Sequence, residues 1–144
     1  MKITFVDSSV GQGPRYQYLT SFLVNDTVSI DAGCLGFLSP PSLQRQVRHV
    51  LLSHSHIDHL ASLPIFLENA CQPDTECVTV YASDPVLESL HNDVFNGRLW
   101  PDLNQLTSAD MPYLNLERLE AEKTIAIDQI RITPVPLDHV VPCF

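Results

Sequence analysis

The residues with the clearest chemistry form one short cluster near the middle of the chain. Positions 54–59 read HSHIDH, which places three imidazoles and one carboxylate within six residues. Neutral imidazole and carboxylate are the ligands that zinc and related divalent ions prefer when one coordination position stays open for water. A single histidine in a polar loop is usually there by chance, but four such side chains in six positions favour a metal site.

The segments on both sides of the cluster predict how it is positioned. The apolar run at 49–53 predicts a buried strand, and a helix is expected to follow. In an extended segment, residues two apart point the same way, so His54 and His56 are expected to reach one ion together. Asp58 is predicted to be the N-cap of the helix, and Asp58 and His59, past the bend, would face a second ion beside the first.

Two motifs carry a resemblance to a known family. The string SHSHIDHL at 53–60, between a strand and a helix, resembles the metal-binding signature of the metallo-β-lactamase-fold hydrolases. Further on, FNGRLWPDL at 95–103 resembles the segment with Phe-Asn and Trp-Pro of class II cyclic-nucleotide phosphodiesterases. The opening, with DSS at 7–9 and GQG at 11–13, is compatible with the same group. The resemblance covers essentially the whole chain.

The resemblance implies an α/β (α+β) fold, namely an αββα sandwich of two facing sheets with helices outside. The 144 residues are expected to form one domain, 1–144, that supplies the N-terminal half and the start of the second half. Strands interspersed with helices agree with such a layered domain. Since comparable sandwiches need roughly 200–250 residues, the chain is expected to be truncated after its third metal motif.

The resemblance also assigns metal ligands. His54, His56 and His139 would bind the first ion, while Asp58 and His59 would bind the second. Asp58 is also the candidate catalytic carboxylate, and the sequence does not decide whether it handles a proton. The expected cofactor is Zn²⁺, two ions in a complete domain, with Mn²⁺ or Fe²⁺ as alternatives. A bridging carboxylate and a last histidine of the family pattern have no counterpart here, so activity of this chain alone is left open.

Three further residues are candidates for supporting roles. Asp31 follows an apolar strand and resembles the buried aspartate that steadies the family's histidine loop, although a plain turn aspartate is an equal alternative. Asn96 and Trp100 are expected to contact the substrate, because aromatic faces stack on bases. A tryptophan that simply fills the core is an equal alternative for Trp100.

The function that the resemblance implies is metal-dependent hydrolysis of a phosphodiester, with a 3′,5′-cyclic nucleotide as the expected substrate, opened to the 5′-monophosphate by a metal-activated hydroxide. A tRNA 3′-processing endonuclease and a thioester or lactone hydrolase on the same fold are the alternatives. A further alternative is that the chain is not an enzyme. It would then be an inactive half-domain that binds metal, or one that pairs with a second copy as a homodimer through its open sheet edges.

Composition limits the partners. The net charge of −9 argues against nucleic acid, because backbone binding needs a basic face, but it permits a small phosphorylated substrate beside metal ions. No apolar run approaches the roughly 20 residues that cross a bilayer, and the N-terminus lacks a signal pattern. The four cysteines show no paired spacing and predict reduced thiols. A soluble cytoplasmic protein without a membrane partner is expected.

Periodicity and turn residues predict the elements. Strands are expected at 2–6, 18–24, 27–30, 49–53, 78–81, 116–119, 124–127 and 130–135. Helices are expected at 42–47, from about 59 to 70, and at 85–95, the last capped by Asp84. Asn25 and Asp26 predict a hairpin turn between the second and third strands.

Overall fold

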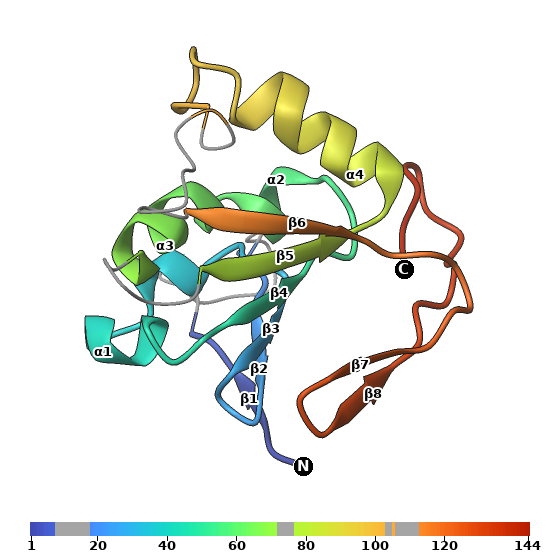
Figure 1. Cartoon of the computed structure of the whole chain (residues 1–144), viewed down its shortest axis with the longest axis horizontal. Coiled ribbons are helices and arrows are strands. Elements are labelled where there is room, and N and C mark those ends of the chain that lie inside the picture. Colours follow the sequence, from blue (N-terminus) through green and yellow to red (C-terminus); the bar gives the residue numbers. More distant parts are fainter. Residues whose placement is uncertain (8–17, 72–76, 103–104, 106–112) are drawn as a thin grey trace.

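The computed structural model describes residues 1–7, 18–71, 77–102, 105 and 113–144. Parts of the motifs quoted above, namely Ser8, Ser9, the GQG string at 11–13 and Leu103, lie outside the described residues. Within the described part, a six-stranded sheet in the order β1-β2-β3-β4-β5-β6 carries helices on one face and a two-stranded β7-β8 hairpin on the other (Figure 1). This mixed α/β arrangement confirms the predicted fold class.

The large sheet is antiparallel at one side and parallel at the other. β1 pairs with β2 and β2 with β3 in antiparallel fashion, whereas β3, β4, β5 and β6 are parallel neighbours. The strands span β1 Ile3–Phe5, β2 Phe22–Val24, β3 Val28–Ile30, β4 His49–Leu51, β5 Val78–Ala82, β6 Leu114–Arg118, β7 Ile125–Ile127 and β8 Ile130–Ile132. The carboxyl ends of the parallel strands therefore meet at one edge, where polar residues that follow them come together.

The described helical segments are short, and most connect one strand to the next. They are the 3₁₀ turn η1 Leu35–Phe37, α1 Pro41–Gln44, α2 Ile57–Leu60, α3 Leu63–Ala70, α4 Asp84–Ser89 and the π-helical turn η2 Leu90–Val94. None of the helices in the described part of the chain has the length and apolar character required to span a membrane.

Alternation along the strands produces two cores, one on each face of the sheet. Leu23, Val50 and Val80 point toward the helices and pack in the larger core, which includes Phe66 of α3. On the opposite face, a smaller group of buried residues packs against the hairpin; it consists of Val24, Val28, Leu51, Leu119 and Ile127. Because side chains alternate along a strand, a shift of the strand pairing by one residue would exchange the side chains of the two faces.

The predicted hairpin turn is confirmed. Asn25 and Asp26 have φ values of 52° and 64° and connect the antiparallel strands β2 and β3. Two successive left-handed residues are typical of the type I′ turn, and asparagine and aspartate tolerate this conformation better than most residues.

Several predicted element boundaries were wrong. The strand expected at 18–24 begins only at Phe22, and the helix expected at 42–47 is the shorter α1. The helix expected to run to Ala70 is interrupted at residues 61–62. Pro64 has no N–H to donate to the Leu60 carbonyl, and its ring would clash with that carbonyl in a continuous helix.

Boundaries in the second part of the chain shift as well. Ser83, with an extended backbone, is the N-cap of α4 in place of Asp84, which lies in the first helical turn where its charge suits the helix dipole. The strand expected at 116–119 is β6 at 114–118, and the one expected at 130–135 ends at Ile132, since Pro134 provides no N–H for strand pairing.

Candidate metal centre

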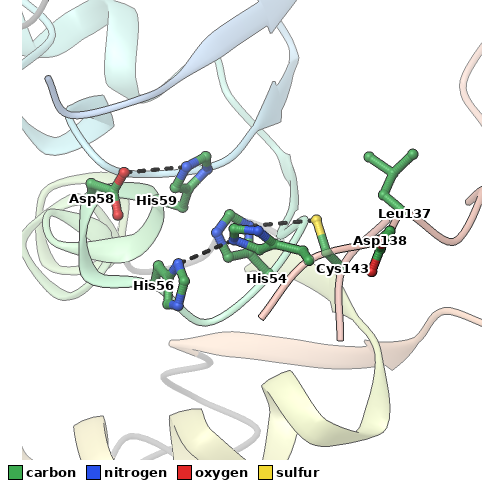
Figure 2. A pocket seen from close by; sticks show the side chains of 8 residues that line it. His54, His56, Asp58, His59, Leu137, Asp138 and Cys143 are labelled. Carbon is green, nitrogen blue, oxygen red and sulfur yellow. Dashed lines mark hydrogen bonds and ion pairs between the residues drawn. The ribbon is translucent and has the colours of Figure 1, made fainter. Parts of the chain in front are cut away.

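Three segments converge at the carboxyl edge of the parallel strands. Asp31 directly follows β3. The cluster at 54–59 follows β4 and enters α2, and Leu137, Asp138 and Cys143 come to the same cavity from the chain after β8 (Figure 2). Because β3 and β4 are hydrogen-bonded neighbours, the residues that follow them are placed side by side. The backbone N–H of Asp31 donates to the Leu51 carbonyl at 2.8 Å and extends this pairing.

The backbone around Gly33 fixes the start of α2. The Thr20 N–H donates to the Asp58 carbonyl at 2.8 Å, and the Gly33 N–H donates to the Thr20 carbonyl at 2.9 Å. A Cβ at Gly33 would lie 1.9 Å from the Asp58 oxygen and 2.5 Å from the Thr20 nitrogen. Only glycine allows the three backbone segments to approach this closely.

His54, His56 and His139 form a group that can hold a metal ion. Their ligand nitrogens all lie within 4.8 Å of one another, although 83 residues separate His56 from His139. The His56 Nδ1 and His139 Nε2 atoms are 3.3 Å apart. Two nitrogens bound tetrahedrally to zinc at about 2.0–2.1 Å are about 3.3–3.4 Å apart, so this spacing fits the predicted ion.

Asp58 and His59 lie beside this group. Their side chains face each other, with 3.4 Å between Asp58 Oδ2 and His59 Nε2, and the His59 ring is 4.1 Å from the His54 ring, centroid to centroid (Figure 2). The prediction that Asp58 is the N-cap was wrong. The His56 carbonyl already accepts the His59 N–H at 3.0 Å, so His56 is the N-cap and Asp58 lies in the first turn.

Asp31 is buried behind the histidines and has a φ of 60°. Its carboxylate accepts the His59 Nδ1–H at 2.6 Å, the Ser53 N–H at 2.8 Å and the Ser53 hydroxyl at 2.9 Å. A buried carboxylate requires such partners, and these include the ring of one predicted metal ligand. The contacts are those expected of a residue that steadies the histidine loop; a plain turn aspartate would not need them.

The cluster lines an open cavity of about 520 Å³. Its walls are His54, His56, Asp58, His59, Leu137, Asp138, His139 and Cys143. Sequence reasoning missed Cys143, whose Sγ is 3.8 Å from His54 Nδ1, and Ser53, whose hydroxyl is 2.9 Å from the same nitrogen. Ser53 is the residue before the cluster and Cys143 is four residues after His139, so proximity in sequence to predicted ligands was the available signal.

Burial shifts two pKa values in this cavity. Desolvation, and then the neighbouring His59, lower the pKa of His54, which favours the neutral ring that metals bind. Desolvation, and then the Asp31 carboxylate, raise the pKa of Cys143, so that its thiol stays protonated at neutral pH.

The structure does not bring Asn96 and Trp100 into the histidine-lined cavity. The Asn96 amide donates to the Asn92 carbonyl at 2.8 Å and accepts the Arg98 and Leu99 N–H groups, so it stabilises its own turn. Trp100 packs against the larger core and lines a separate apolar cavity of about 320 Å³, which agrees with the core-filling alternative. Its buried Nε1 has no hydrogen-bond partner in the described structure.

The residues present fit a divalent metal by their chemistry. Three imidazoles converge, a carboxylate and a fourth imidazole lie adjacent, and the rings of His54 and His59 each use Nδ1 to contact a neighbouring group. This leaves Nε2 of both rings for an ion. Nitrogen and oxygen donors of this kind accept zinc, iron or manganese, and the donor set does not select among them.

Comparisons with known proteins agree with this geometry. The chain is 27% identical over 99 residues to a probable 3′,5′-cyclic-nucleotide phosphodiesterase of Yersinia pestis; the match covers 67% of this chain and 27% of that relative. Its fold resembles yeast PDE1, with a TM-score of 0.66, 15% identity, and coverage of 87% of this chain and 52% of that one. It also resembles the metallo-β-lactamase fold protein YhfI of Bacillus subtilis, with a TM-score of 0.62, 17% identity, and coverage of 98% and 54%.

These matches confirm the metallo-β-lactamase fold that the histidine motif predicts, and that fold implies binding of divalent metal ions. The chain spans about a quarter of the curated relative and about half of the two solved structures. A family model described as "Beta-lactamase superfamily domain" matches residues 26–143, a range that includes strands β3 to β8, the histidine cluster and His139. The chain therefore belongs to the β-lactamase superfamily domain family.

Proposed function

We propose that this protein is a metal-dependent hydrolase of phosphodiesters and that its substrate is a 3′,5′-cyclic nucleotide, opened to the 5′-monophosphate. The observation that carries the proposal is the convergence of His54, His56 and His139 beside Asp58 and His59 in one open cavity. The name of the Yersinia pestis relative supports the choice of cyclic nucleotide. The cavity volume of about 520 Å³ is within the range of roughly 300–1,000 Å³ that is common for small-molecule sites.

The side chains have separate tasks in this reaction. His54, His56 and His139 would hold the first divalent ion, and Asp58 with His59 the second. Bound ions of this type supply activation of water and neutralisation of charge on phosphoryl oxygens. Asp58, whose carboxylate faces the cavity, is the group that takes up the proton, and no serine or cysteine nucleophile is required.

The two ion positions differ in their number of protein ligands. Three imidazoles serve the first position, and one carboxylate and one imidazole serve the second. Because the affinity for a metal ion grows with the number of protein ligands, we expect the first ion to bind more tightly than the second.

The proposal also includes a cytoplasmic location and formation of a homodimer. The mass of the metal-loaded protein in solution tests whether the dimer forms.

The decisive experiment measures turnover and metal content together. The purified chain is loaded in turn with Zn²⁺, Mn²⁺ and Fe²⁺ and incubated with cyclic AMP and cyclic GMP, and the 5′-monophosphates are quantified by chromatography. A precursor tRNA in a parallel reaction tests the endonuclease alternative, and His56→Ala is the inactive control.

We expect formation of a 5′-monophosphate with at least one metal and none with His56→Ala. Two bound ions without turnover of either nucleotide would refute the proposed substrate. Cleavage of the tRNA precursor alone would favour the endonuclease.

A further inference from the structure

The Ser53 hydroxyl connects the buried Asp31 carboxylate with His54, a predicted ligand of the first ion. Its hydroxyl lies 2.9 Å from both carboxylate oxygens of Asp31 and 2.9 Å from Nδ1 of His54. Asp31 in turn contacts Nδ1 of His59 at 2.6 Å. A continuous chain of hydrogen bonds therefore runs from His54 through Ser53 and Asp31 to His59.

The chemistry of these groups sets the direction of each bond. An ionised carboxylate only accepts, so the proton between His59 and Asp31 belongs to His59 Nδ1. The Ser53 hydroxyl has one proton, which it donates to the carboxylate as the stronger acceptor. Toward His54 the hydroxyl must then accept, which requires a proton on His54 Nδ1. Both rings are thereby held with the proton on Nδ1, so that the Nε2 atoms are left for the ion positions, where His59 Nε2 lies 3.4 Å from Asp58 Oδ2.

Burial strengthens the hydrogen bonds that fix the position of the proton on each ring. Asp31 is 2% exposed and His54 is 5% exposed, so water competes little for these bonds. The carboxylate is also held in place, because the Ser53 N–H donates to Asp31 Oδ1 at 2.8 Å. Cys143 Sγ, at 3.8 Å from His54 Nδ1, is a more distant neighbour of this nitrogen than the serine.

We propose that Ser53 is a positioning residue that extends the influence of Asp31 from His59 to His54. One buried carboxylate would then fix the tautomer and orientation of one ligand at each of the two ion positions, directly at the second and through the serine hydroxyl at the first. The inference rests on the metal centre of the proposed function but not on its substrate, and it is tested without turnover.

The first test uses nitrogen-15 NMR of the metal-free protein at neutral pH, which distinguishes Nδ1–H from Nε2–H histidines. In the unmodified protein we expect a proton on Nδ1 of both His54 and His59. Ser53→Ala should turn His54 into a mixture and leave His59 unchanged, while Ser53→Thr, which keeps the hydroxyl, should restore His54. A merely structural role of Ser53 would not change the tautomer of a single ring.

The second test measures zinc affinity by competition with a chromophoric chelator. Loss of a hydrogen-bond partner of a metal ligand typically weakens binding about 10- to 100-fold. We expect Ser53→Ala to weaken the tighter ion by this factor and Asp31→Asn to weaken both ions, with Ser53→Thr close to the unmodified protein.

The inference is overturned if His54 carries its proton on Nε2 in the unmodified metal-free protein, a result that needs no variant to fold. It is also overturned if folded Ser53→Ala keeps the Nδ1–H tautomer and the zinc affinity of the unmodified protein. Failure of cyclic-nucleotide turnover would leave both measurements unaffected.

Discussion

Gly33→Ala is the substitution with the most specific structural consequence. The added Cβ would meet the Asp58 carbonyl oxygen at 1.9 Å, whereas ordinary van der Waals contact begins at 3.4 Å, so it is about 1.5 Å too close. Backbone nitrogen and oxygen of Thr20, at 2.5 and 2.8 Å, block the other directions. All three obstacles are backbone atoms, which cannot move aside by rotation of a side chain.

The structure gives the size of the effect. Overpacking of a buried position costs about 1–3 kcal/mol. Separation of the segments also breaks the hydrogen bonds from Thr20 to Asp58 and from Gly33 to Thr20, at about 0.5–1.5 kcal/mol each. The expected loss of unfolding free energy is therefore about 2–6 kcal/mol, a large part of the roughly 5–15 kcal/mol of a typical domain.

Gly97→Ala is the matched control. Gly97 has a φ of 72°, and a Cβ there would meet nothing within 4 Å, so only the left-handed backbone penalty of about 1–2 kcal/mol applies. Urea unfolding of the metal-free variants, followed by circular dichroism, compares the two losses. Zinc titration provides a second readout, because displacement of Asp58 and His59 should weaken the second ion in Gly33→Ala only. An equal or smaller loss in Gly33→Ala than in Gly97→Ala would refute the reasoning.

Three further predictions concern the same cavity. His56→Ala should abolish binding of the tighter ion in calorimetry and change the urea midpoint of the metal-free protein little, since this ring is only half-buried; unchanged zinc affinity would contradict its role. Burial lowers the pKa of His54 from its usual 6.5, so the unfolded chain binds a proton that the folded chain does not, and metal-free stability should decrease as pH falls below about 6.5. His54→Gln should flatten this dependence in urea titrations at several pH values, and an unaltered slope would count against it. Iodoacetamide should label Cys143 slowly, because burial raises the pKa of its thiol, and zinc should slow the labelling further. Cys34 is fully buried and its pKa is also raised by burial, so it should react only when the protein unfolds. Peptide mass spectrometry measures the labelling of both cysteines.

Local patterns were sufficient for much of the fold. The Asn25-Asp26 turn and the apolar strand before the histidine cluster followed from residues close together in sequence, and the metallo-β-lactamase fold followed from the family resemblance of the histidine motif. Errors occurred where a boundary depends on a neighbour. Pro64 divides the helix after the cluster, and the His56 carbonyl starts α2 two residues before the predicted cap.

The candidate site was likewise predictable where its residues are close in sequence and less so where they are distant. The spacing of His54, His56, Asp58 and His59 indicated a metal centre because ligands this close in sequence are also close in space. Resemblance added His139, and the structure brings it within hydrogen-bond distance of His56. The sequence motif that included Asn96 gave no sign that its amide is already used within its own turn.

The sequence by itself determined which side chains can bind metal and roughly where strands and turns fall, because these properties depend on residue type and short spacing. Only the tertiary structure decided that Asp31 is hydrogen-bonded to His59 and, through the Ser53 hydroxyl, connected to His54. These contacts depend on the parallel pairing of β3 with β4. It also decided that Cys143 lines the cavity and that backbone atoms occupy the space of a Cβ at Gly33, because both depend on segments that come into contact only when the chain has folded.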